Sequence, residues 1–300
     1  MLKARNATYW QALLILAITL SNCQYSVAES DNIAQGHCGA LFIYVANGRS
    51  SISAYSVNNT TGSLTQVEDS PFAASGRPTS VMVNHDGNFL YAVGIEPNFN
   101  QSQGILAYRI NGNTGALTPV PESPFVLADN PLSVTVNHAG SIAYVVSRNN
   151  SISAYKVGKT GTLTRIEGVP FATEIDPRNR PFGDIRNLQN PLSIAINPLD
   201  TFAYSVNYGF GDPHKGSISA YRINTTTGAF TGVLGSPFAI EDNPVSIAIN
   251  PAGNFAYVTT WDTEYHIGSV FAYSINQSTG AITKVEGSPY VAGMDPDLLL

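Results

Sequence analysis

The sequence predicts an all-β fold, a β-propeller of four-stranded antiparallel blades, and three observations lead to this prediction. The pentapeptide SISAY occurs at residues 51–55, 151–155 and 217–221, with close variants at 105–108 and 269–273. The β-branched and aromatic runs of this repeat end in Asn, Gly, Pro or Asp and have no helical period. The repeat is about fifty residues long, which suits one propeller blade.

Each copy of the repeat divides into four β-runs, named A to D. Examples are SVMVN for run A, FLYAV for run B, SISAY for run C and LTQVEDSPF for run D. Runs A and B are joined by turns such as NHDG and NPAG, which favour tight antiparallel connections. Runs C and D are joined by turns that end in Thr-Gly, where glycine can adopt a positive φ. Each copy therefore predicts one antiparallel sheet.

The ends of the repeat leave the number of blades open. The first copy begins at run B, and Leu298–Leu300 stand where another run A is expected. A ring closed by these leucines would have five blades. The alternative is a fragment of a seven-bladed ring. In both cases we expect the propeller domain to span residues 41–300, after an N-terminal tail at 29–40.

Residues 1–28 have the pattern of a signal peptide. Lys3 and Arg5 form a basic start, an apolar run extends from Ala12 to Leu20, and small residues at 26–28 suit a signal peptidase. The apolar run is about half of the ~20 residues that a membrane-spanning helix needs. We therefore expect a secreted or periplasmic protein without a transmembrane span.

A lipid anchor on Cys23 is an alternative for the same segment, because LSNC resembles a bacterial lipobox. Removal of the signal peptide would leave 13 basic and 21 acidic residues, a net charge of −8. Such a surface repels phosphate backbones, so nucleic acid is not an expected partner. Only Cys38 would remain, which excludes a disulfide framework and a cysteine-based zinc site.

Residues 243–260, NPVSIAINPAGNFAYVTT, and residues 279–290, TGAITKVEGSPY, carry a family resemblance together with their copies. They resemble the lactonase-like seven-bladed propellers, which include 6-phosphogluconolactonase and carboxymuconate cyclase relatives and the YVTN-repeat propellers. The resemblance covers nearly all of residues 41–296. It implies that members acting as enzymes carry a histidine at or just before the start of run A, often beside an arginine. The corresponding positions here are Thr79-Ser80, Leu132-Ser133, Leu192-Ser193 and Val245-Ser246.

Loop lengths predict which face of the propeller carries the site. The A–B and C–D turns lie on one face and are short, whereas the B–C and D–A connections lie on the other. Every insertion falls in the second set, at residues 94–104, 172–190, 207–216 and 260–268. Long loops on a rigid scaffold concentrate binding and catalysis. We therefore expect the functional site on this second face, named the loop-rich face.

Ionisable residues gather in two neighbouring insertions of the loop-rich face. The candidate catalytic residues there are Glu174, His214, Arg180 and Arg186, and the candidate ligand-binding residues are Arg178 and Lys215. Glu174 or His214 would act as a base, and the arginines would grip an anion or stabilise an oxyanion through forked hydrogen bonds. The alternative is a solvated loop held by its own ion pairs.

The segment WDTEYH supplies a second group of candidates. Trp261 and Tyr265 could stack on a sugar or an aromatic ligand, with His266 beside them. Asp262, Glu264 and His266 would point the same way in an extended strand. Three ligands at alternate positions of one strand rarely close around a single ion, so no metal is expected. No nucleotide or cofactor motif is present, and no cofactor is expected.

Two functions follow from these patterns. In the first, the protein binds an unknown protein or a small anionic or carbohydrate ligand on the loop-rich face, without catalysis. In the second, it hydrolyses or cyclises a carboxylate-bearing lactone as a metal-independent enzyme. His85 and His138 lie in A–B turns, and we expect a turn role for them. The repeated serines that open run A are expected to form strand-end hydrogen bonds.

Overall fold

Strands and turns make up the described part of the chain. The computed structural model describes residues 16–19, 24–25, 36–37, 41–47, 50–74, 76–95, 104–126, 131–147, 150–166, 171–172, 190–209, 216–261 and 267–294. Within these ranges no helix is long and apolar enough to cross a membrane.

Five sheets share one strand order. The first contains β1 (Leu16–Thr19), β4 (Leu41–Asn47), β5 (Ser51–Val57), β6 (Leu64–Gln66) and β7 (Phe72–Ala73). The second contains β8 (Arg77–Val83), β9 (Phe89–Ile95), β10 (Gly104–Ile110), β11 (Leu117–Pro119) and β12 (Phe125–Val126). The third contains β13 (Pro131–Val136), β14 (Ile142–Ser147), β15 (Ser151–Val157), β16 (Leu163–Arg165) and β17 (Phe171–Ala172).

The fourth and fifth sheets repeat this order. The fourth contains β18 (Asn190–Ile196), β19 (Phe202–Tyr208), β20 (Ser217–Ile223), β21 (Phe230–Gly232) and β22 (Phe238–Ala239). The fifth contains β23 (Asn243–Ile249), β24 (Phe255–Trp261), β25 (Ile267–Ile275), β26 (Ile282–Lys284) and β27 (Tyr290–Met294). A separate small pair joins β2 (Gln24–Tyr25) to β3 (Gly36–His37).

Each large sheet is one blade, and its strands are the predicted runs A to D. All pairings are antiparallel, as predicted, but run D is divided into two short strands that both pair with run C. In the first blade, β1 occupies the inner position that run A fills elsewhere. This strand comes from the predicted signal peptide, so cleavage after Ala28, which stays a prediction, would remove it.

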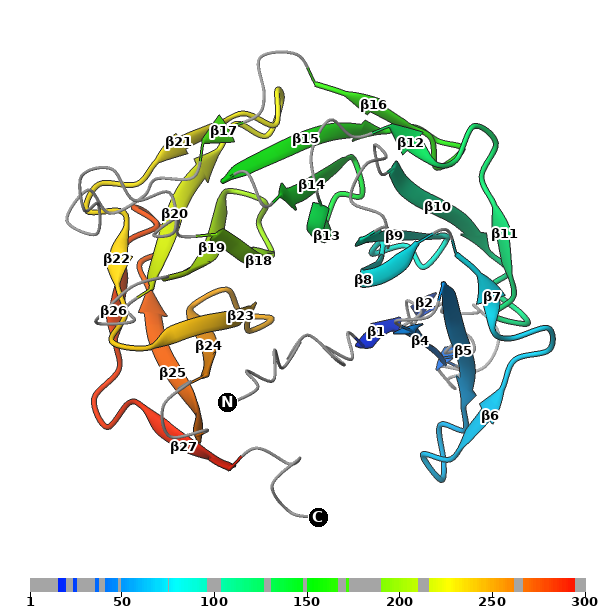
Figure 1. The fold of residues 1–300 in the computed structure, drawn as a ribbon, viewed down its shortest axis with the longest axis horizontal. Coiled ribbons are helices and arrows are strands. Elements are labelled where there is room, and N and C mark those ends of the chain that lie inside the picture. The colour runs from blue at the N-terminus through cyan, green and yellow to red at the C-terminus, as the bar shows by residue number, and fades with distance from the viewer. Residues whose placement is uncertain are drawn as a thin grey trace, which may run out of the picture.

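The five blades stand around a common centre in an open arc (Figure 1). The order runs from the first blade, drawn in blue, through green to the fifth blade, drawn in orange and red. The predicted all-β propeller is confirmed. The fifth blade does not meet the first, and this favours part of a larger ring over a closed ring of five.

Side chains of the repeat hold the turns within each blade. Asn84 ends run A, and its Oδ1 accepts the backbone N–H groups of Asn88 and Phe89 at 3.0 and 2.8 Å. In run D, the Oγ of Ser70 accepts the backbone N–H of Ala54 at 2.8 Å. The same serine-to-alanine contact recurs in the second, fourth and fifth blades. The Asn and Ser that end these runs are therefore structural parts of the repeat.

Neighbouring blades are joined through the tyrosine at the centre of run B. Its hydroxyl donates to the carbonyl of the glycine that ends the C–D turn of the next blade. The four contacts are Tyr44 to Gly115 at 2.8 Å, Tyr91 to Gly161 at 3.2 Å, Tyr144 to Gly228 at 3.1 Å and Tyr204 to Gly280 at 2.9 Å. All four tyrosines are 0% exposed. A buried hydroxyl needs such a partner, because an unsatisfied polar group in the interior is costly.

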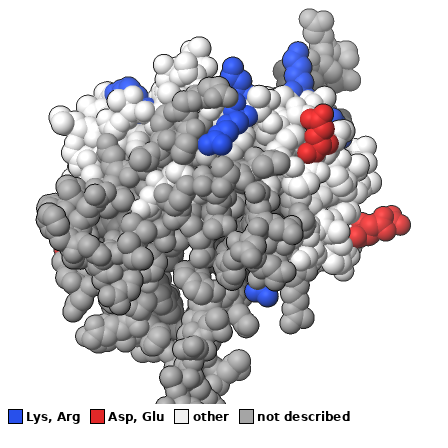
Figure 2. Space-filling view, turned by 45° about the horizontal axis from the view of Figure 1, so that its top comes forward, with Lys and Arg blue, Asp and Glu red and all other residues white. Residues whose placement is uncertain are grey.

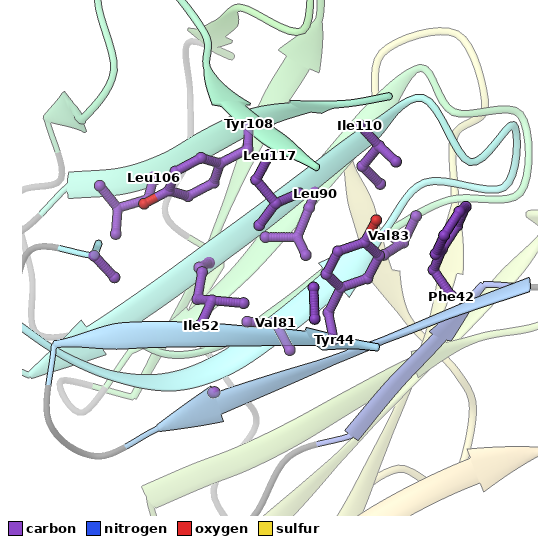
Figure 3. Close-up of a cluster of buried hydrophobic side chains, with 14 of the residues drawn as sticks. Phe42, Tyr44, Ile52, Val81, Val83, Leu90, Leu106, Tyr108, Ile110 and Leu117 are labelled. Carbon is purple, nitrogen blue, oxygen red and sulfur yellow. The ribbon is translucent and has the colours of Figure 1, made fainter. Parts of the chain in front are cut away.

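Apolar side chains surround each of these hydrogen bonds. Between the first and second blades, Phe42 and Tyr44 pack against Val83 and Leu90 (Figure 3). Equivalent clusters lie between each later pair of blades. The glycine is needed for close approach, because a Cβ at Gly115 would overlap the ring of Phe42. Its φ of 75° also disfavours other residues.

Asp200 stands in a turn position that glycine fills in the other blades. Its φ is 56°, which is unfavourable for most residues that carry a side chain. The carboxylate accepts the backbone N–H groups of His138 and Ala139 at 2.8 and 2.9 Å, and the Asn137 amide at 3.0 Å. These contacts tie the turn of the fourth blade to that of the third and compensate for the backbone strain.

Replacement of Tyr204 by Phe is expected to lower the free energy of unfolding by about 1 kcal/mol, because it removes one buried hydrogen bond without leaving a large cavity. Urea unfolding at neutral pH would measure the change. Tyr257→Phe is the matched control in the fifth blade, where the same tyrosine is 43% exposed, and it is expected to change little. Equal losses in the two variants would contradict the proposed role of the interblade hydrogen bond.

Alkaline pH is expected to destabilise the propeller. Burial raises the pKa of Tyr108 and Tyr273 to about 12, with the Glu241 carboxylate adding to the effect at Tyr273. Burial also raises the pKa of Tyr44, Tyr91 and Tyr204. Unfolded tyrosine titrates near pH 10, so the stabilisation is complete below about pH 10 and is lost as the pH rises through the folded pKa.

Above about pH 10, each such tyrosine should remove up to about 1.4 kcal/mol of stability per pH unit. Urea unfolding in steps from about pH 8 to about pH 11.5 would check this. A level profile up to the highest pH would contradict the assignment, as would a loss that is complete before about pH 9.

Candidate functional site

The loop-rich face lies where the inner strands begin and the run B strands end. Strand pairing places Arg77 opposite Ile95 in the second blade and Asn243 opposite Trp261 in the fifth. Most of each predicted insertion lies outside the described residues. These undescribed positions include Glu174, Arg178, Arg180, Arg186, His214, Lys215, Tyr265 and His266. Trp261 ends β24, and only its backbone is described.

The described residues of this face form a floor beneath those loops. Each of the inner strands β8, β13, β18 and β23 contains a β-bulge between its proline and the serine two residues later. Bulges redirect side chains and are enriched near active sites. Here the extra residues are Thr79, Leu132, Leu192 and Val245. All four are partly exposed, so the bulges contribute side chains to the accessible part of the floor.

Hydroxyl groups of the floor link one inner strand to the next. Thr79 Oγ1 donates to the Leu132 carbonyl at 3.1 Å, and Ser80 Oγ accepts the Val134 N–H at 3.3 Å. The predicted strand-end role of the run A serine is confirmed at Ser80. A hydroxyl that already accepts a backbone N–H and is 3% exposed is poorly placed for nucleophilic attack.

Neutral polar groups form the fourth- and fifth-blade side of the floor. Asn207 Nδ2 donates to Ser217 Oγ at 3.1 Å and to Ser219 Oγ at 2.9 Å. These are two serines of a SISAY segment. Asn47 makes the same pair of contacts with Ser51 and Ser53 in the first blade. The repeated serines of run C therefore bind the asparagine that ends run B.

Asn243 connects the same region to the chain that follows run B. Its side chain is 2% exposed, and its Oδ1 accepts the Gly209 N–H at 3.3 Å. Thr260 Oγ1 donates to Asp242 Oδ2 at 3.2 Å. Burial raises the pKa of the neighbouring Tyr208. Its hydroxyl is therefore neutral at ordinary pH and can donate a hydrogen bond.

Arg77 is the cation of the described floor, and the sequence prediction missed it. It is exposed and stands directly before the bulged segment of β8. Within the described part of the chain, no carboxylate forms an ion pair with it. The equivalent positions in the fourth and fifth blades are Asn190 and Asn243. This break in an otherwise regular Asn-Pro pattern was the available sequence signal.

An exposed guanidinium among neutral hydrogen-bonding groups suits an anionic ligand. Arginine can make two parallel hydrogen bonds to a phosphate or a carboxylate. Charged side chains of the described residues are few and scattered on the face shown in Figure 2. A single cation is therefore not neutralised by a dense array of neighbouring acids.

His85 and His138 lie in A–B turns on the opposite face, as predicted. Their rings are 5.8 Å apart, and His138 Nδ1 lies 3.5 Å from Asp200 Oδ1. They take part in the contact between the turns of neighbouring blades and belong to no site on the loop-rich face.

Comparison with known proteins decides the family. A family model described as "Lactonase, 7-bladed beta-propeller" matches residues 32–124. A 6-phosphogluconolactonase from Enterobacter sp. (strain 638) is 36% identical over 270 residues, covering 76% of this chain and 75% of the relative. The chain belongs to the lactonase family of β-propellers. The predicted resemblance is thereby confirmed.

Solved structures of other lactonase-like and unrelated propellers show the same fold. A protein from Bacteroides uniformis ATCC 8492, described as a candidate 6-phosphogluconolactonase, matches with a TM-score of 0.59 at 14% identity, over 93% of this chain and 85% of that one. A hypothetical selenium-binding protein from Sulfolobus tokodaii matches with a TM-score of 0.52 at 14% identity, over 86% and 65%. At this identity the likeness concerns the fold alone.

Proposed function

We propose that this lactonase-family propeller hydrolyses a lactone that carries a negatively charged group, and that the lactone binds on the loop-rich face at Arg77. The observation that carries the proposal is the exposed Arg77 at the bulged start of an inner strand. It is supported by the relative at 36% identity, whose name specifies a phosphorylated sugar lactone. Of the two functions predicted from the sequence, this is the enzymatic one, extended to phosphate as well as carboxylate.

Arg77 is suited to hold the anionic group of the substrate. The ladder pairing of Arg77 with Ile95 fixes its backbone, while the side chain stays exposed. The neutral floor, which includes Asn243 and Thr260, offers hydrogen-bonding groups without an opposing cluster of charge. Binding energy at this remote group would orient the lactone ring for attack.

Hydrolysis further needs a base that activates water and a donor for the carbonyl oxygen. The addition of water to the lactone carbonyl forms a tetrahedral oxyanion, and breaking of the ring C–O bond then yields the hydroxy acid. Glu174 or His214 as the base, and Arg180 or Arg186 as the oxyanion partner, remain predictions, because these residues lie outside the described part of the chain.

A second candidate is ligand or protein binding without catalysis. One observation favours it: no histidine occurs in the inner strands β8, β13, β18 and β23. The predicted export would also separate the protein from substrates inside the cell. Export, the lipid anchor on Cys23 and the stacking roles of Trp261 and Tyr265 remain proposals.

Arg77→Ala is expected to raise the KM for 6-phosphogluconolactone about tenfold or more, because a hydrogen bond to a charged group contributes about 1.5–3 kcal/mol. For gluconolactone without the phosphate, the KM should change less than twofold. A carboxylate-bearing lactone should respond as the phosphorylated one does. Lys159→Ala is the matched control, because it removes an exposed cation from a C–D turn on the opposite face.

Three outcomes separate the candidates. A charge-selective rise in KM supports lactone hydrolysis at Arg77. Absence of turnover by folded protein, together with calorimetric binding of the phosphorylated lactone that Arg77→Ala abolishes, supports binding without catalysis. Equal kinetic effects of Arg77→Ala and Lys159→Ala would overturn the assignment of the site to Arg77.

A further inference from the structure

The outward face of the fifth blade lacks a contact that every earlier blade has. Its run B tyrosine, Tyr257, is 43% exposed, whereas Tyr44, Tyr91, Tyr144 and Tyr204 are 0% exposed. The hydroxyls of these four donate to a glycine carbonyl of the following blade. Among the described residues, Tyr257 has no such acceptor. The fifth blade therefore presents an unfilled donor on an otherwise interface-forming surface.

The first blade lacks the complementary half of the same contact. Gly62 ends its C–D turn, is exposed, and has no atom within 4 Å of where a Cβ would stand. In the next four blades the equivalent glycines are buried, and each lies against a Phe or Ile side chain of the preceding blade. These glycines are Gly115, Gly161, Gly228 and Gly280. Gly62 is thus an acceptor site to which no described tyrosine donates.

Burial along run B shows the same difference. Ile43 and Val45 of the first blade are only partly buried. The corresponding side chains Ala143 and Val145 of the third blade are 0% exposed, because the second blade covers them. The first blade therefore keeps an interface surface that faces away from the second blade and is not covered as its counterparts are.

The two surfaces are complementary halves of an interface that occurs four times within the chain. We propose that the interval between the fifth and first blades is the docking site of a separate polypeptide that folds into two blades of the same repeat. The family is seven-bladed and five blades are present here, which leaves room for two. The first docked blade would offer a Thr-Gly turn to Tyr257, and the last would place an aromatic-x-Tyr run B over Gly62.

This occupant fits better than a second copy of the whole chain. A second copy docked at Tyr257 with the same rotation per blade would bring five blades into an interval that holds two, and its later blades would collide with the first copy. A small ligand could not satisfy Tyr257 and Gly62 together, because they lie on opposite sides of the interval (Figure 1).

The full chain can be tested with two of its own blades as the probe. Residues 131–240 form the third and fourth blades, and they contain the Gly161 turn and the Tyr204 run B that the docked segment needs. A second sample carries this segment attached after Leu300 through a flexible Gly-Ser linker, so that effective concentration favours docking. Both samples are unfolded in urea, with and without each substitution.

Tyr257→Phe is expected to increase the unfolding equilibrium constant about fivefold in the extended chain and to leave that of the 300-residue chain unchanged. Gly62→Asn should likewise destabilise the extended chain more than the 300-residue chain, because asparagine tolerates a φ of 71° but its side chain fills the site. Tyr204→Phe in the original fourth blade is the control and should destabilise both chains.

Three results would overturn the proposal. One is an equal effect of Tyr257→Phe in the two chains. Another is proteolysis of the attached blades while residues 41–294 remain protected, since docked blades should share that protection. The third is self-association of the 300-residue chain that Tyr257→Arg abolishes in sedimentation analysis, because the occupant would then be a second copy.

Discussion

The hydrogen bond from a run B tyrosine to the glycine carbonyl of the next blade is the contact on which this propeller depends. It joins residues 71 to 84 positions apart and is buried in all four cases. Apolar burial supplies most of the attraction between blades, but it is not directional. The hydroxyl and carbonyl supply direction, because they satisfy each other only when the blades have the right rotation and height.

The candidate site follows from this constraint. The inner strands β8, β13, β18 and β23 begin on the loop-rich face, and the rotation between blades sets their separation. Their bulges and the hydroxyl links of Thr79 and Ser80 then form a rigid floor. An exposed Arg77 on such a floor has a fixed backbone without a fixed side chain, which suits capture of a charged group before the longer loops act on it.

Departures from the repeat were more informative than the repeat itself. Arg77 replaces an asparagine on the loop-rich face, Asp200 replaces a glycine in a turn, and Tyr257 lacks a following blade. Each position is ordinary in isolation and stands out only against its copies. Asp200 contacts the neighbouring turn, whereas Arg77 and Tyr257 remain accessible at the surface. A regular scaffold therefore shows where its surface has been modified.

The sequence by itself determined the all-β class, the four runs of each blade, the division into two faces and the family. These properties are local or periodic: alternation of side chains, turn residues and loop lengths are all written along a few dozen consecutive residues. Only the tertiary structure decided which glycine each tyrosine meets, that the arc of five blades stays open, and that Arg77 faces outward. Those outcomes depend on the rotation between sheets, which arises from packing of side chains far apart in the chain and has no period in the sequence.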